Sequence, residues 1–152
     1  MPTNTQSAGT VAVTHAFSVK WLWAWCEMHG YKRAEVRSIP VPSFLPPTGR
    51  IAVHLALRYS RADFEGDLAY VRDNWKSGAD VAANCPPFEE LAKRAGLIVG
   101  TVAYSKCAED PCKLALRSPA WLKRFVRTRG GAGWWRLSER DRALVEAQLR
   151  RG

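Results

Sequence analysis

Two segments of the chain have the residue pattern of buried β-strands, and they restrict the fold more than any other feature. Residues 49–57, GRIAVHLAL, alternate between large aliphatic side chains and small residues that flank His54. Residues 97–104, LIVGTVAY, are almost entirely apolar, which predicts a central strand, and Gly100 predicts a bend or a close backbone approach. Helical segments surround these strands without a regular βαβ alternation. We therefore expect an α+β fold, a small mixed, mostly antiparallel β-barrel with flanking helices outside it.

Four segments carry apolar residues at helical spacing. Ser18 and Ser138 are the expected N-caps of the first and the last of these predicted helices. Gly30 follows the first helix, at a position where a left-handed residue is favoured. The Trp-rich stripe of the first helix predicts core packing, or alternatively a cleft edged by Trp21. The predicted helices span residues 18–29, 60–76, 87–95 and 138–150.

Three other segments have weaker patterns. Residues 32–39 alternate like a strand, whereas the four prolines of residues 40–48 exclude a central strand there. Residues 113–137 predict one or two short strands, including a last one at GWWRL. The small-residue face around His54 leaves two interpretations open: it forms the floor of a cleft, or another element packs on its alanines.

The charge of the chain is large and unevenly distributed. The net charge is +9 and the pI about 9.8. Residues 113–152 carry eleven Lys and Arg against three Asp and Glu, whereas residues 61–112 carry six against nine. Such a balance favours an anionic partner, nucleic acid before acidic membrane, although a charge excess that only keeps the protein soluble remains the alternative.

Other function classes are disfavoured by what the sequence lacks. It has no apolar run near the roughly 18 residues of a membrane span and no signal-peptide pattern, so we expect a cytoplasmic protein without membrane contact. The four cysteines form no CxxC pair, and we expect no metal and no cofactor. Residues 1–12 predict a flexible tail. The high Arg and Ala content fits a bacterial or phage-encoded protein.

Residues 30–37, GYKRAEVR, have the spacing GxKxxExR and resemble the motif of the ASCH family, which belongs to the PUA-like superfamily. Four further patches resemble segments of that family in the same order: residues 18–25, 49–54, 98–102 and 131–135. The resemblance implies a PUA-like barrel over residues 13–137. Residues 138–152 lie beyond the resemblance, and we expect them to form a basic helix packed on the same domain.

Members of that family are thought to bind RNA or nucleotides, so the resemblance implies a ligand cleft at the motif. Some relatives hydrolyse N4-acetylcytidine and others cut single-stranded RNA; the former carry a threonine where this chain has Glu35. If this chain is an enzyme, we expect a ribonuclease or an amidohydrolase that uses Lys32 and Glu35 as catalytic residues. The expected ligand-binding residues are Lys32, Glu35, Arg37, Ser38, His54 and Trp21.

The chemistry of the motif allows several roles. Arg37 offers a planar fork for a phosphate or a carboxylate. Neighbouring arginines and burial would lower the pKa of Lys32, as a base or nucleophile requires, whereas Glu35 would hold it charged. The alternative is that Lys32, Glu35 and Arg37 form a buried ion network that only stabilises the barrel.

The basic C-terminal segment is a second candidate site. Basic side chains surround Phe125, and a mixture of cations and aromatic rings suits contacts to a nucleic-acid backbone combined with base stacking. Trp134 and Trp135 follow, although closing the barrel is an equally direct role for them. The expected backbone-contacting residues are Lys123, Arg124, Arg127 and Arg129.

Three functions remain at this stage. The first is an RNA-binding or modified-nucleotide-binding module, and the second is a hydrolase acting on RNA or on a modified nucleoside. The third is a protein-interaction module of a regulatory complex, for which the acidic residues 61–90 are the candidate surface. We expect a monomer whose partner is RNA or a nucleotide.

Overall fold

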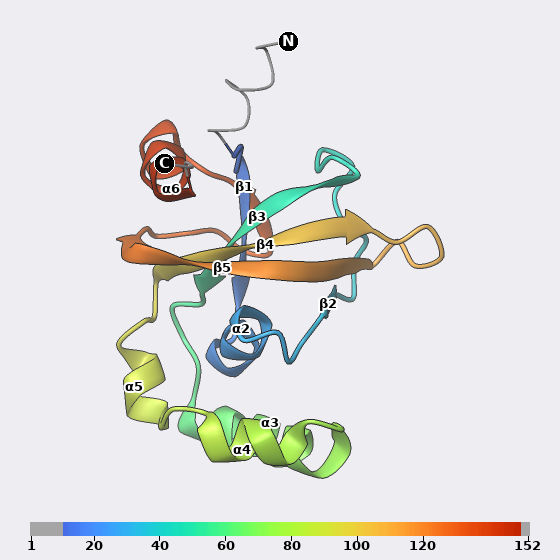
Figure 1. The fold of residues 1–152 in the computed structure, drawn as a ribbon, viewed down its shortest axis with the longest axis vertical. Coiled ribbons are helices and arrows are strands. Elements are labelled where there is room, and N and C mark those ends of the chain that lie inside the picture. Colours follow the sequence, from blue (N-terminus) through green and yellow to red (C-terminus); the bar gives the residue numbers. More distant parts are fainter. Residues whose placement is uncertain (1–10, 150–152) are drawn as a thin grey trace.

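The computed structural model describes residues 11–149, in which six strands form one sheet accompanied by five helices (Figure 1). Residues 1–10 of the expected tail and the last residues of the expected basic helix lie outside this range. The strands are β1 (His15–Val19), β2 (Ala34–Val36), β3 (Thr48–Leu55), β4 (Leu97–Lys106), β5 (Lys113–Arg127) and β6 (Trp134–Arg136). The helices are α2 (Trp21–Met28), α3 (Arg61–Asn74), α4 (Gly78–Asn84), α5 (Phe88–Ala92) and α6 (Glu139–Leu149).

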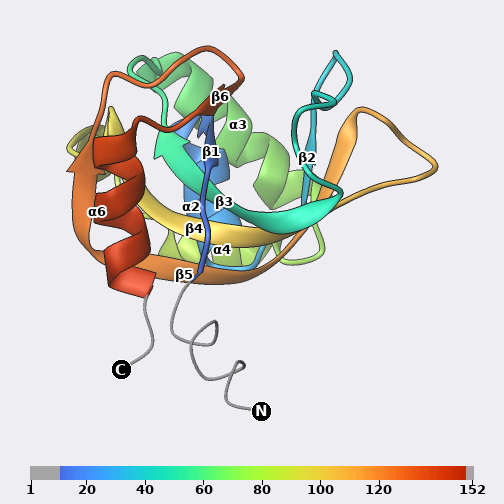
Figure 2. The same ribbon diagram turned by 90° about the horizontal axis from the view of Figure 1, so that it is seen from above.

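The sheet is mixed and curled. Its strand order is β2-β5-β4-β3-β1-β6, and β1 and β3 are its one parallel pair among the described residues. The two edge strands, β2 and β6, do not pair with each other, so the sheet is a half-barrel that stays open on one side (Figure 2). The expected α+β class and the mostly antiparallel, curled sheet are confirmed at this level.

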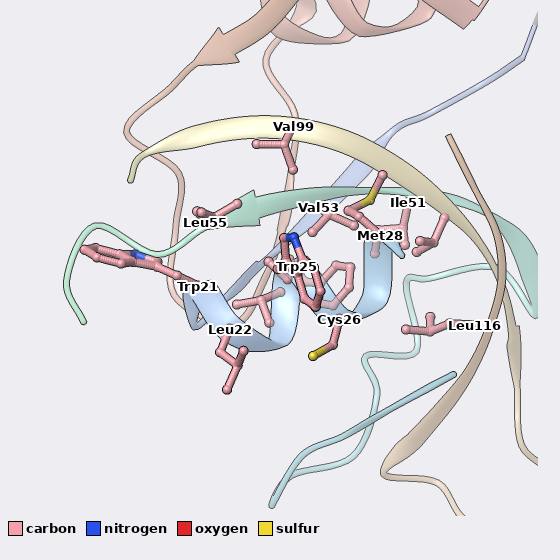
Figure 3. Packing of buried hydrophobic residues seen from close by; sticks show 14 of the residues in the cluster. Trp21, Leu22, Trp25, Cys26, Met28, Ile51, Val53, Leu55, Val99 and Leu116 are labelled. Atoms are coloured by element: carbon pink, nitrogen blue, oxygen red, sulfur yellow. The ribbon is translucent and has the colours of Figure 1, made fainter. Parts of the chain in front are cut away.

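The sheet separates two hydrophobic cores. On the concave face, α2 packs into the curve with α3, α4 and α5 behind it; on the other face, α6 packs against β5 (Figures 1 and 2). Alternation along β3 places Ile51 and Val53 in the first core and Ala52 in the second. Figure 3 shows Trp25 and Met28 of α2 reaching the sheet. The expectation that the helices lie outside the barrel is therefore wrong for α2, because its nearly all-apolar surface is buried within the curve.

Local signals explain most helix ends. Ser60 accepts a hydrogen bond from the backbone N–H of Asp63 at 2.9 Å, and Ser138 accepts one from Asp141 at 3.1 Å. Gly30 has φ +78° where the first helix ends, as predicted. The prediction that Ser18 caps that helix is wrong, because Ser18 lies in β1 and α2 begins only at Trp21.

The largest difference from the expected elements is β5, a single strand of 15 residues where one or two short strands were predicted. Its pairing with β4 shifts register twice, and Ser118 has φ +52°. β2 pairs only with Lys113–Ala115 at one end, so most of the strand has a free edge. No helix within residues 11–149 combines the length and the apolar surface needed to cross a membrane.

Candidate functional site

The side chains of Lys32, Glu35 and Arg37 converge. Nζ of Lys32 donates to Oε1 of Glu35 at 3.0 Å, and Nε of Arg37 donates to Oε2 at 2.5 Å. The turn at Gly30 makes this possible, because it places Lys32 before β2 begins, where its backbone N–H donates to the carbonyl of Cys26. Lys32 therefore does not follow the alternation of the strand, and its ammonium folds back beside Glu35.

A fourth member of this group, Glu27, comes from α2. Its side chain has no exposed surface, and its Oε2 accepts a hydrogen bond from Nζ of Lys32 at 3.2 Å. Its Oε1 receives no hydrogen bond from the described residues. Sequence reasoning missed Glu27, although an acid in an otherwise apolar helix, five residues before Lys32, was a usable signal. We call Glu27, Lys32, Glu35 and Arg37 the ion cluster.

The pKa shifts in the ion cluster have opposite signs. Burial raises the pKa of Glu27 well above its ordinary value, and a side-chain hydrogen bond with Glu35 raises it further. Burial would also raise the pKa of Glu35, but the hydrogen bond with Glu27 and the charges of Lys32 and Arg37 lower it overall. Burial thus opposes ionisation of Glu27, whereas Lys32 and Arg37 favour the ionised form of Glu35.

Lys32 is held in its charged form. Burial alone would lower its pKa, but Glu27 and Glu35 outweigh this effect, and the pKa is raised above 10.5. The expectation of a lowered pKa is therefore wrong, and the alternative that Glu35 keeps the lysine protonated is the one that the structure supports. A protonated Lys32 can bind an anion or donate a hydrogen bond, but it is not a nucleophile at neutral pH.

Arg37 connects the two sides of the open half-barrel. Its Nη2 donates to the carbonyl of Ser18 in β1 at 3.0 Å, and its guanidinium lies 5.1 Å from the ring centre of Trp134 in β6. The ion cluster therefore joins the end of β2 to β1 and β6, where the sheet has no hydrogen bonds of its own. This contact gives direct support to the ion-network interpretation, in addition to any role in binding.

Two small cavities flank the ion cluster, which is partly accessible from both: the side chains of Lys32 and Arg37 are 20% and 23% exposed. The cavity on the Lys32 side has about 240 Å³ and the one on the Arg37 side about 220 Å³. The first is lined by Glu27, Gly30, Lys32, Arg33, Val102, Leu116, Arg117, Ser118 and Pro119. The second is lined by Ser18, Val19, Lys20, Trp23, Glu35 and Arg37.

Three of the expected ligand-binding residues lie elsewhere or make no contact in this group. Trp21 is buried, and its Nε1 donates to the carbonyl of Ala56 at 2.7 Å. Ser38 is exposed just after Arg37. His54 points to the opposite face of the sheet, where its ring contacts Ser18 Oγ at 2.9 Å and the carbonyl of Thr128 at 3.1 Å.

His54 is 1% exposed, so the small-residue face of β3 is not the floor of a cleft. The loop at Gly130 packs against the imidazole, and Trp135 meets it edge-on at 5.5 Å between ring centres. Burial lowers the pKa of His54, which keeps the ring neutral at pH 7. The alternative, that another element packs against the small residues of this face, is what the structure shows.

The predicted backbone-contacting residues line a larger depression. Lys123, Arg124 and Arg127 of β5 line a groove of about 710 Å³ together with Arg140 of α6. Arg129 follows β5 in an exposed position and does not line the groove. We call this the basic groove; its other lining residues are Phe125, Val126, Leu144, Ala147 and Gln148.

The basic groove follows the free edge of β5. The side-chain amide of Gln148 accepts from the backbone N–H of Arg124 at 2.9 Å and donates to its carbonyl at 2.8 Å, so α6 satisfies the strand edge at that residue. The groove is lined by residues 123–127 of β5, whereas β2 pairs with residues 113–115 at the other end of that strand. Figure 1 shows α6 and β2 at these opposite ends, so the basic groove and the ion cluster are separate sites.

The chain matches no protein-family model and no curated protein. Within residues 11–149, no three His, Cys, Asp or Glu side chains are grouped as metal ligands would be. All four cysteines are free thiols. The assignment of a function therefore depends on the geometry of the ion cluster and of the basic groove.

Proposed function

We propose that this chain is an RNA-binding domain of the PUA-like, ASCH kind. In this proposal the basic groove holds the phosphate backbone, and the cavities beside the ion cluster hold a nucleotide-sized group. The observation that carries it is the basic groove, since four cationic side chains gather along one depression at the edge of β5. Phosphate contacts of this type supply most of the affinity of non-specific nucleic-acid binding.

The cations of the groove are available to a ligand. Within the described residues, Lys123, Arg124 and Arg127 form no ion pair, whereas Arg140 is paired with Asp141 at 2.8 Å. Basic residues on a free strand edge also prevent edge-to-edge association of sheets. That protective role predicts no affinity for RNA, so a binding measurement separates the two.

At the ion cluster, the geometry favours binding over catalysis. Lys32 lines one of the two cavities and Arg37 the other, so a cationic side chain is partly exposed in each. Lys20 adds another cation at the rim of the cavity next to Arg37. A phosphate or an acidic group of a nucleotide fits this field, and the protonated state of Lys32 argues against a hydrolase that needs it as a base.

The test is the binding of a labelled single-stranded RNA, followed by fluorescence anisotropy over a series of salt concentrations. Affinity should fall with salt, with a log–log slope of roughly −0.7 for each phosphate contacted. Lys123→Ala combined with Arg127→Ala should weaken binding and make the slope shallower. Arg61→Ala combined with Arg72→Ala removes the same charge from α3, in the layer behind α2, and should have little effect.

Two outcomes would reject the proposal: no binding by the parent protein, or binding that ignores salt. Equal losses in the two double variants would mean that net charge alone attracts the RNA. For the cavity beside Arg37, Lys20→Ala is the matched change, because Lys20 is exposed and its side chain forms no hydrogen bond or ion pair within residues 11–149. We expect it to weaken nucleotide binding without lowering the melting temperature.

A further inference from the structure

Two large aromatic side chains of β5 are exposed beside the stretch where the pairing of β5 with β4 is interrupted. Trp121 and Phe125 are each 38% exposed, and their ring centres lie 6.3 Å apart at an interplanar angle of 29°. The pairing of β5 with β4 shifts register between Ile98 and Gly100, which is the stretch opposite these rings. The two rings thus form a nearly parallel pair on the surface, whereas their neighbours Leu122 and Val126 are buried in the second core.

Cationic groups surround this pair. Lys123 lies between the two rings along the strand and is exposed. The guanidinium of Arg94, just after α5, lies 5.9 Å from the ring centre of Trp121. Phe125 also lines the basic groove, so the aromatic pair and the groove form one continuous surface across the edge of β5. We call Trp121, Lys123, Phe125 and Arg94 the stacking face.

Trp121 is held in place by side chains of the domain body. His29, at the end of α2, meets Trp121 edge-on at 5.4 Å between ring centres and is itself packed against Trp25 at 4.4 Å. The indole is therefore oriented by the body of the domain, although Trp121 remains 38% exposed. A fixed aromatic surface loses little conformational entropy when a flat group stacks on it.

We infer that the stacking face binds the bases of a single-stranded nucleic acid whose backbone follows the basic groove. This inference rests on the proposed function and adds the class of substrate. A flat ring surface beside a row of cations matches a strand in which bases and phosphates alternate along the chain. In a duplex the bases are paired and stacked inside, so their faces cannot reach Trp121 or Phe125. The free edge of β5 gives the nucleic-acid strand a path between the basic groove and the stacking face.

The experiment compares Trp121→Leu and Phe125→Leu with the parent protein on a single-stranded pyrimidine RNA. Each leucine should lower the affinity by roughly tenfold and leave the salt slope unchanged, since stacking releases no counterions. Trp121→Phe should restore most of the affinity, because it keeps a ring at this position. Phe44→Leu, which removes a ring that is 57% exposed at a different place, should bind like the parent.

Two ligand controls sharpen the result. An oligomer of the same length without bases should bind the parent weakly, and Trp121→Leu should cause no further loss with it. A duplex of the same length should bind the parent less tightly than the single strand and should be insensitive to Trp121→Leu. Circular dichroism of each variant verifies that the fold is retained.

The inference fails if both leucine variants bind the single strand like the parent, if duplex and single strand bind equally, or if an acidic peptide displaces the RNA and shows the same dependence on Trp121. This failure is distinct from failure of the proposed function. If the change of Lys123 and Arg127 weakens binding while the leucine variants do not, RNA binding stands and only the stacking face is rejected.

Discussion

At the scale of single residues, Glu27 controls how the stability of the fold depends on pH. Its carboxyl is buried, and burial together with the hydrogen bond to Glu35 raises its pKa above the ordinary value of 4.5. Because the unfolded chain loses this proton at a lower pH than the folded protein does, the parent loses stability as the pH rises from about 4.5 through the folded pKa. Glu27→Gln cannot ionise, and its amide can donate to Glu35 and accept from Lys32.

We therefore expect Glu27→Gln to equal the parent in free energy of unfolding near pH 4.5 and to exceed it at pH 7, as measured by urea denaturation across this range. Glu35→Gln is the counterpart, because the folded pKa of Glu35 is lowered. It should cost about 3–5 kcal/mol at pH 7, since Lys32 and Arg37 lose their partner, and the cost should shrink as the pH falls below 4.5. A less stable Glu27→Gln at pH 7 would contradict this account.

At the scale of elements, the loop between β5 and β6 is fixed by the contact of Gly130 with His54. Gly130 has φ +74°, and a Cβ at this position would lie 2.5 Å from Cε1 of His54. Gly130→Ala should lower the free energy of unfolding by about 2 kcal/mol or more, because the left-handed backbone is strained and the imidazole loses hydrogen bonds. Gly66→Ala is the control: Gly66 lies within α3 with no atom within 4 Å of a Cβ, and alanine there should stabilise by about 0.5–1 kcal/mol. Thermal denaturation of both variants tests this prediction. An unchanged melting temperature for Gly130→Ala would contradict it, because it would show that the loop can move away from His54.

The sequence predicted those elements in which burial by neighbouring elements determines the pattern of apolar residues. β3 and β4 are flanked by strands on both edges and covered on both faces, so their apolar residues show in the sequence. The residues after Ala115 in β5 have a free edge and mostly exposed side chains, so no alternation marks the longest strand. α4, GADVAAN, consists mainly of small and polar residues and buries only Gly78 and Val81.

The candidate site was predictable to a similar degree. The resemblance of residues 30–37 to the ASCH motif implied that Lys32, Glu35 and Arg37 meet, and a bend after Gly30 permits it. Glu27 was missed although it lies only five residues before Lys32. Trp121 was not predicted, because its contact with His29 joins two elements that are distant in the sequence. His54 was placed in the wrong site because alternation shows that a side chain leaves the first core, but not what covers it on the other face.

At the scale of the whole molecule, both cores share one sheet, so we expect the domain to unfold as a single unit that includes α6. Val145 of α6 is fully buried in the second core, against Ile98 and Val126. Val145→Asp places an unpaired charge there and should cost about 3–5 kcal/mol. Leu144→Asp, one residue earlier at 41% exposure, should change stability by no more than about 0.5 kcal/mol.

The comparison is made by urea denaturation followed with two probes, tryptophan fluorescence for the Trp-rich first core and far-ultraviolet circular dichroism for the whole chain. If α6 belongs to the cooperative unit, Val145→Asp shifts both transitions together, because α2 and α6 pack on opposite faces of the same strands. If α6 is an independent attachment, the helix signal falls first while the fluorescence transition stays in place. In that second case, unfolding of α6 would also remove one wall of the basic groove. RNA affinity would then fall at a lower urea concentration than the one that unfolds the first core.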